Sequence, residues 1–133
     1  IALVLFINCF QDYNADKAAN KNSWVVKLAG PGDKANYRKP FSIWKGMMIT
    51  SFLLIVGASL YAQNYFTLIA LIPLLIFNFA SKKGSEWLIQ WEKEDANLQQ
   101  LPYELLIVNV STIGIHFLTG VLLTIGVLLS VWI

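Results

Sequence analysis

The sequence predicts an all-α protein, a bundle of transmembrane helices. The mean hydropathy is +0.56 and only 14% of the residues are charged, whereas about a quarter are charged in a soluble domain. Three apolar runs, 46–62, 65–80 and 105–133, approach or exceed the ~17 to 25 residues that a spanning helix needs. A soluble bundle of buried helices is the alternative. It is disfavoured because these runs show no amphipathic stripe that would separate a wet face from a dry one.

The first segment, residues 1–19, is expected to be the inner end of a transmembrane helix that carries an acid motif. Its apolar stretch ends at Asn8, which makes it much shorter than a span. No Met, basic flank or signal-peptide cleavage site stands at the start. We therefore expect the chain to begin inside a helix and to be the C-terminal part of a larger membrane protein, without its N-terminal half.

Residues 20–40 are expected to form a cytoplasmic loop, and the spans follow as transmembrane helices at 41–62, 65–81 and 103–133. Gln63-Asn64 is expected to make a tight turn between the first two of these helices. Within 81–102, apolar residues recur at helical spacing among charged ones, which predicts an amphipathic helix on the bilayer surface. The apolar positions of that pattern are Trp87, Leu88, Trp91 and Leu98.

The distribution of charge predicts the orientation in the membrane. All ten lysine and arginine residues lie in two regions, 17–45 and 82–93. By the positive-inside rule both regions are cytoplasmic, and the Gln63-Asn64 turn lies on the opposite side. The net charge of +2 is too small to indicate nucleic-acid binding, and the single Cys9 excludes an internal disulfide.

The strongest functional signal is the series Asn8, Asp12 and Asp16, which stands where the first apolar segment leaves the membrane. Residues four apart lie on one helix face, about one turn from each other. Two carboxylates and a carboxamide oxygen in such a stripe suit a hard cation such as Mg²⁺ that also holds a phosphate. Acids at a helix C-terminus interact unfavourably with the helix dipole, so their presence there indicates a functional role.

Lysines follow the acids directly, at Lys17, Lys21 and Lys27. Beside a metal held by carboxylates they would balance the charge of a diphosphate. The alternative interpretation is that Asp12 and Asp16 are solvated acids that pair with Lys17 and Lys21 at the membrane edge.

The segment from Asn8 to Gly30 resembles the second aspartate-rich motif of the UbiA superfamily of intramembrane prenyltransferases. The most similar members are the dihydroxynaphthoate polyprenyltransferases of menaquinone synthesis. Ser23 and Lys27 are conservative replacements in that motif, while Cys9, Gln11 and Asn20 depart from it, which leaves the aromatic acceptor open within the superfamily. Identical positions are Asn8, Asp12, Asp16, Lys21, Val26 and Leu28. The end of the chain, from Thr119 to Trp132, is also similar to that subfamily's last helix.

The resemblance implies the C-terminal part of a nine-helix bundle in the bacterial inner (cell) membrane, with the acid motif on the cytoplasmic side. It implies Mg²⁺-dependent transfer of a polyprenyl group from polyprenyl diphosphate to an aromatic acceptor, expected to be dihydroxynaphthoate. Asp12 and Asp16 would be the catalytic metal ligands, and Asn8 would complete or orient that shell. Lys21 and Lys17 would bind the diphosphate. The first acid motif would belong to the missing half, so this part alone is not expected to be active.

The last helix carries a polar face made of Asn109, Thr112, His116 and Thr119. Polar groups in lipid are costly, so this face is expected to point into the bundle, either as a cavity wall or, the favoured interpretation, for hydrogen bonds between helices. Four glycines are expected to allow close helix packing: Gly57, Gly114, Gly120 and Gly126.

A non-enzymatic protein is the rival to the prenyltransferase interpretation. In that case the chain is a helical membrane subunit or part of a transporter, and its acids only pair with lysines. A second acid motif at another helix's cytoplasmic end would support the enzyme. A carboxylate at mid-membrane or a repeat with broken helices would support transport.

Overall fold

The computed structural model describes residues 1–30, 35–93 and 104–132. All the secondary-structure elements in these ranges are helices, as the sequence predicts. The elements in chain order are α1 (Ala2–Gln11), α2 (Tyr13–Ala18), α3 (Trp24–Ala29), α4 (Arg38–Tyr61), the 3₁₀-helix η1 (Tyr65–Leu71), α5 (Leu74–Glu92) and α7 (Leu106–Trp132).

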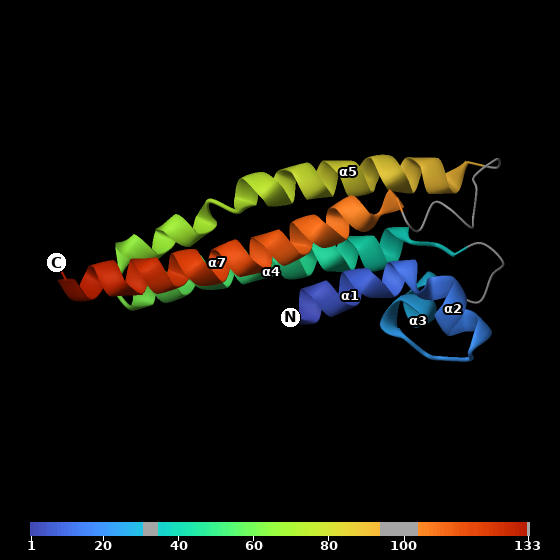
Figure 1. The fold of residues 1–133 in the computed structure, drawn as a ribbon, viewed down its shortest axis with the longest axis horizontal. Coiled ribbons are helices and arrows are strands. Elements are labelled where there is room, and N and C mark those ends of the chain that lie inside the picture. Colours follow the sequence, from blue (N-terminus) through green and yellow to red (C-terminus); the bar gives the residue numbers. More distant parts are fainter. Residues whose placement is uncertain (31–34, 94–103, 133) are drawn as a thin grey trace.

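Three stretches are long and apolar enough to cross a membrane, namely Arg38–Tyr61, Tyr65–Glu92 and Leu106–Trp132. They correspond to the three expected spans, so among the described residues the prediction of an all-α chain with three helices able to span a membrane is confirmed. Figure 1 shows α4, α5 and α7 as long helices that lie roughly along one axis, with α5 antiparallel to α4 and α7, and with α1 beside α4 and α7 along part of their length. The short helices α2 and α3 lie together at the end of the bundle opposite the C-terminus.

The second span is a broken helix. Its first part is the 3₁₀-helix η1, and the α-helix resumes at Leu74 directly after Pro73. Proline has no N–H to donate and its ring obstructs the preceding turn, which explains the break. The expected turn at Gln63-Asn64 is present, with Gln63 in a left-handed conformation at φ 53°. The hydroxyl oxygens of Ser59 and Thr67, 2.6 Å apart, bridge the helices on either side of this turn.

The expected surface helix within 81–102 is not a separate element in the described part of this range. Helix α5 continues without interruption from Leu74 to Glu92, and Leu98 lies outside the described residues. Trp87 and Trp91 do not face a bilayer surface but are buried, 4% and 3% exposed. The apolar period that suggests a surface helix therefore belongs to the inner face of a long helix.

The buried tryptophans pack on Tyr37, the residue that precedes α4. The ring centroids of Tyr37 and Trp91 are 4.7 Å apart, and those of Tyr37 and Trp87 are 5.2 Å apart. Trp91 Nε1 donates a hydrogen bond of 2.7 Å to the carbonyl oxygen of Ala35. Arg38 and Glu92 form an ion pair at the same place, with Nη2 2.6 Å from Oε2. These contacts fasten the beginning of α4 to the end of α5.

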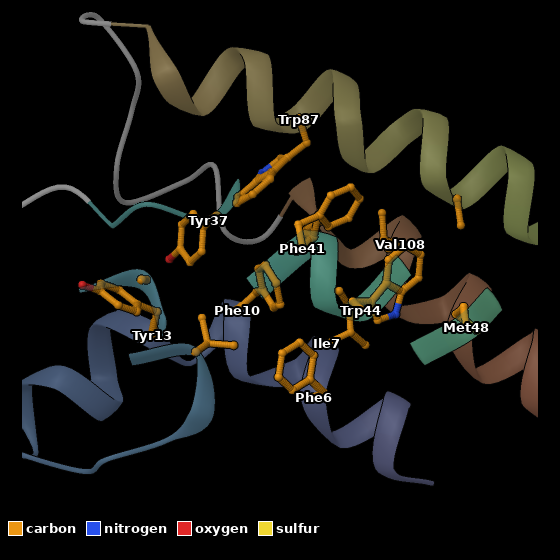
Figure 2. Packing of buried hydrophobic residues seen from close by; sticks show 14 of the residues in the cluster. Phe6, Ile7, Phe10, Tyr13, Tyr37, Phe41, Trp44, Met48, Trp87 and Val108 are labelled. Carbon is orange, nitrogen blue, oxygen red and sulfur yellow. The ribbon is translucent and has the colours of Figure 1, made fainter. Parts of the chain in front are cut away.

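Helix α1 joins the same cluster from the other side (Figure 2). Phe10 is fully buried and stacks on Tyr37, with the ring centroids 5.4 Å apart. It also meets Phe41 edge to face, and Ile7 is buried one turn earlier. The helix that leads to the acid stripe is therefore held by aromatic packing against α4.

Only one of the four glycines singled out in the sequence lies at a close helix contact. A Cβ on Gly126 would lie 2.6 Å from Thr67 Cα and 2.7 Å from the carbonyl oxygen of Phe66. The expectation is wrong for Gly57, Gly114 and Gly120, where a Cβ would meet nothing within 4 Å. Gly84 is the second close approach, against the ring of Phe41. The sequence around Gly84 does not predict this contact, because the contacting ring belongs to another helix, α4.

Replacing Gly126 by alanine is expected to destabilise the protein by about 1 to 3 kcal/mol, because a methyl group would collide with backbone atoms of η1. Gly57→Ala is the matched control. It adds the same methyl group to a helix where nothing is close, so it is expected to be neutral or to stabilise by up to about 1 kcal/mol. The unfolding midpoints of both purified variants in detergent are compared by heating aliquots and measuring the folded fraction that remains by size-exclusion chromatography. Equal midpoints would contradict the close packing of α7 on η1.

The orientation derived from the positive-inside rule predicts that the two ends of α4 lie on opposite sides of the membrane. Cysteines introduced as Lys39→Cys and Ala62→Cys, in a Cys9→Ser background, should react with a membrane-impermeant maleimide from opposite sides. Both positions are exposed, so the label can reach them from solvent. Labelling of both from the same side of sealed vesicles would overturn the orientation.

Candidate functional site

The acid stripe follows one helical path although two helices contribute to it. Helix α1 ends at Gln11, yet Asp12 keeps near-helical dihedrals, φ −82° and ψ −3°. The Asp12 amide donates to the carbonyl oxygen of Asn8 at 3.2 Å, and the Asp16 amide to that of Asp12 at 2.7 Å. Asn8, Asp12 and Asp16 therefore stand on successive turns, as the spacing predicts.

The three side chains differ in their surroundings. Asp12 is exposed and Asn8 is half-buried, whereas Asp16 is only 5% exposed. Carboxylates are rarely so buried unless they are paired. The environment of Asp16 therefore decides what this site can do.

Lys21 is the partner of Asp16, with Nζ 3.1 Å from Oδ1. The hydrogen bond from this ammonium lowers the pKa of Asp16 below its ordinary value of 3.8, and the Ser23 hydroxyl acts in the same direction. The same bond raises the pKa of Lys21. Asp16 is thus an ionised carboxylate at neutral pH, beside a cation.

A left-handed residue brings the lysine back to the acid. The chain reverses at Asn20, whose φ is 53°, and the Lys21 amide then donates to the Asp16 carbonyl oxygen at 2.7 Å. Glycine and asparagine are the residues that adopt this conformation most readily. Asn20 therefore adopts at little cost the conformation that this turn needs.

The lysines predicted to bind phosphate line one open hollow of about 450 Å³. Lys17, Lys21 and Lys27 contribute the charge, and the Nζ of Lys17 lies 5.7 Å from the ring centre of Tyr13. The remaining wall consists of Asn20, Asn22, Val26 and Gly30. Three ammonium groups and two carboxamides around one space suit an anion that carries several negative charges.

Asn8 makes a contact that sequence reasoning missed. Its side-chain oxygen accepts a hydrogen bond of 3.0 Å from Asn109 Nδ2 on α7. Asn109 is 4% exposed, so the favoured interpretation of the polar face of α7, hydrogen bonding between helices, holds at this position. The Thr112 hydroxyl instead donates within its own helix, to the Val108 carbonyl oxygen. The side-chain carboxamide of Asn8 therefore links the first turn of the acid stripe to α7.

The donor set bears on the expected Mg²⁺ site. Among the described residues, no three His, Cys, Asp or Glu side chains come together in a group that could hold a metal ion. The stripe instead offers the two carboxylates of Asp12 and Asp16. Mg²⁺ commonly takes one or two carboxylates and completes its shell with water and substrate phosphates. The residues fit an ion shared with a bound phosphate better than a cage made by protein alone.

No protein-family model, curated protein or solved structure matches this chain. Any inference about function therefore rests on the residues and their arrangement.

The pairing of Asp16 with Lys21 predicts a dependence of stability on acid pH. Because the pKa of Asp16 is lowered in the folded state, the pair stabilises the fold above the ordinary carboxyl pKa of 3.8. That contribution should be lost as the pH falls below this value and through the native pKa. A Lys21→Met variant should lack this part of the acid dependence, whereas Lys39→Met, at an exposed lysine elsewhere, should retain it.

Thermal unfolding over a pH series measures the loss, and the carboxyl carbon shift of Asp16 in labelled protein follows its titration directly. A native pKa for Asp16 that is unchanged by Lys21→Met would show that the ion pair does not form in solution.

Proposed function

We propose that this chain is the C-terminal half of a UbiA-type membrane prenyltransferase. It would take part in Mg²⁺-dependent transfer of a polyprenyl group from polyprenyl diphosphate to an aromatic acceptor, with dihydroxynaphthoate as the expected acceptor. The observation that carries the proposal is the hollow lined by Lys17, Lys21 and Lys27, in which Lys21 also pairs with Asp16 of the acid stripe. Acids for a metal and lysines for a phosphate stand together at one end of membrane-spanning helices.

Each residue of the site has a distinct role in this proposal. Asp12 is exposed and its carboxylate can reach a ligand from solvent, while Asp16 supplies a second carboxylate already in its charged form. Asn8 fixes the first turn of the stripe through Asn109. Lys21 and Lys17 neutralise the diphosphate. When bound to the two carboxylates and the phosphates, Mg²⁺ would act as a Lewis acid toward the leaving group.

The reaction needs a dry site as well as charge. The allylic C–O bond breaks and its electron pair leaves with the diphosphate, so a carbocation develops on the prenyl chain. An aromatic ring carbon then bonds to the cation, and the ring gives up its displaced proton to the released diphosphate. Water would capture the cation first if it had access. Phe10, Tyr37 and Phe41 pack together where α1 meets the start of α4, and the upstream half of the protein would have to close the open side of the site to water.

The proposed enzyme would need the rest of its own chain and a lipid bilayer. An upstream half of the same protein would supply the first acid motif and the remaining helices of the bundle. The three apolar spans are compatible with a lipid bilayer, here the bacterial inner membrane. The basic residues around the site favour its placement on the cytoplasmic side.

A second candidate function is favoured by the ion pair itself. Asp16 and Lys21 already satisfy each other at 3.1 Å, as the non-enzymatic interpretation expects. In a structural subunit or transporter fragment, this pair would only close the turn between α2 and α3. Asp12 discriminates between the two functions, because it is exposed and a structural role predicts little effect of changing it.

In the full-length protein, Asp12→Asn should lower Mg²⁺-dependent release of diphosphate by about 100-fold or more while the protein stays folded. The substitution keeps the size of the side chain but removes the charge on which an Mg²⁺ site depends. Asp16→Asn should act likewise. The assay uses purified protein in lipid with polyprenyl diphosphate and dihydroxynaphthoate.

Glu86→Gln is the matched control, since Glu86 is an acid paired with a lysine, Lys83, away from the site. It should leave turnover unchanged. If Asp12 is only a surface acid, its loss should cost under about 1 kcal/mol of stability and leave turnover intact. Equal rates for wild type and Asp12→Asn would therefore remove the main reason to consider the chain an enzyme.

Lys21→Ala should chiefly raise the KM for the diphosphate substrate, because the ammonium interacts with the ground state and the transition state alike. Lys82→Ala, at an exposed lysine on α5, serves as the control. Initial rates over a range of substrate concentrations separate KM from kcat. A loss confined to kcat would assign Lys21 a role in the chemical step instead.

A further inference from the structure

Lys45 joins α4 to α5 through a hydrogen bond. Its Nζ donates 3.0 Å to Ser85 Oγ, and the Ser85 hydroxyl donates 2.8 Å to the Ser81 carbonyl oxygen. The same ammonium lies 4.9 Å from the centre of the Phe41 ring. These contacts hold the half-buried Lys45 at the edge where the two helices meet. An ammonium has three N–H groups, so a positive charge fixed in this way can also donate to a ligand.

Lys82 brings a second positive charge to this edge. It precedes Ser85 by three residues on α5, and residues at this spacing are neighbours on a helix surface. Lys82 is exposed and forms no ion pair with the residues that the structure describes. Glu86, one turn further along, is bound to Lys83, whose Nζ lies 2.9 Å from its carboxylate. Lys83 therefore offsets the charge of this acid, and Lys45 and Lys82 leave a net positive edge between the helices.

An exposed apolar strip leads away from the two lysines along both helices. Its members are spaced four or seven to eight residues from one of the lysines, so they continue the same helix sides. Its apolar side chains are between 48% and 73% exposed, and it also contains one exposed carboxamide. The strip, which we call the α4–α5 strip, consists of Ile49 and Leu53 on α4 and of Leu75 and Asn78 on α5.

The two lysines stand at the depth of lipid headgroups. Lys45 lies about 25 Å along α4 from Ala62, at 1.5 Å per residue. This length is close to the ~30 Å thickness of the hydrocarbon core of a bilayer. With the Gln63-Asn64 turn at the outer boundary, Lys45 and Lys82 come to the inner boundary, and the α4–α5 strip faces the hydrocarbon.

We propose that Lys45 and Lys82 bind the phosphate of an anionic phospholipid of the inner leaflet, whose acyl chains lie along the α4–α5 strip. The charge argues for this occupant, because two cations match a headgroup with a net negative charge. A zwitterionic lipid would bring its own ammonium to the lysines. A free phosphate would leave the apolar strip without a ligand.

Asn78 adds a polar contact that a phospholipid can use. It lies about one turn deeper than Lys82, where an ester carbonyl oxygen of the lipid can accept a hydrogen bond from its carboxamide. Such a bond would offset the cost of placing an exposed carboxamide in lipid. This surface is separate from the acid stripe, so the inference does not depend on the proposed function.

The test measures which lipids lie beside the α4–α5 strip. A bimane fluorophore is attached to Ile49→Cys in full-length protein without other cysteines, in mixed vesicles of phosphatidylglycerol and phosphatidylcholine. Bromine atoms on the acyl chains of one lipid or the other quench the label, and the two series give the relative binding constant of the lipids. With both lysines present, phosphatidylglycerol should be preferred by about 20-fold. The same label on Leu53→Cys repeats the measurement about one turn deeper.

Lys45→Gln and Lys82→Gln should each lower this preference by about fivefold, and the two together should abolish it. Lys82 is exposed, so its replacement tests the site even if Lys45→Gln disturbs the contact with Ser85. Lys39→Gln is the matched control. It removes an exposed lysine of the same helix, about two turns from Lys45, and should leave the preference unchanged.

Equal quenching by both lipids in the protein with both lysines would show that the strip does not select an anionic lipid, and would overturn the proposal. Absence of quenching by either lipid would show that protein from the upstream half covers the strip, with the same consequence. An effect of Lys39→Gln as large as that of Lys82→Gln would reduce the preference to a general attraction between basic residues and the membrane surface. That result would also overturn a specific site.

Inorganic phosphate separates a lipid from a free anion as the ligand of these lysines. At equal ionic strength, where screening is the same, phosphate in place of chloride should leave the lipid preference unchanged. Loss of the preference in phosphate but not in chloride would identify a site for soluble phosphate and would overturn the proposal.

Discussion

The position of the acid stripe depends on the packing around Tyr37. This residue is 1% exposed and meets four other aromatic rings, two from α1–α2 and two from α5. Lipid provides no hydrophobic force that would drive helices together, so helix association relies on close packing and hydrogen bonds. Aromatic side chains offer large contact areas with defined geometry. Tyr37 thereby links α1 and α2 to α5, alongside Phe41, which contacts both Phe10 and Gly84.

Burial also shapes Tyr37 itself. It raises the pKa of the Tyr37 hydroxyl far above its ordinary value of 10.0, and neighbouring Tyr13 acts in the same direction. The group therefore stays neutral, and its ring contributes packing. Tyr13 uses its own hydroxyl differently, donating 3.3 Å to the Gly30 carbonyl oxygen beneath the cationic hollow. The two tyrosines thus connect the aromatic packing to the loop that bears the lysines.

Electrostatics within the site follow from a short-range reversal of the chain. Asn20 turns the backbone so that Lys21 folds back on Asp16 while Lys17 and Lys27 remain around the same space. The pair keeps Asp16 charged although the side chain is nearly buried. Lys21 therefore both pairs with Asp16 and lines the cationic hollow.

The sequence by itself determined the helical class, the three spans and the spacing of the acid stripe. Composition and periodicity are local properties, and an i, i+4 series such as Asn8, Asp12 and Asp16 lies on one face of any helix that contains it. The turn at Gln63-Asn64 is local in the same way. Only the tertiary structure decided which faces are covered. It buried Trp87 and Trp91 against Tyr37 where their period suggested a surface helix, paired Asn8 with Asn109, and selected Gly126 and Gly84 as the close contacts. These outcomes depend on residues from other helices, and the sequence pattern of one helix carries no information about its neighbours.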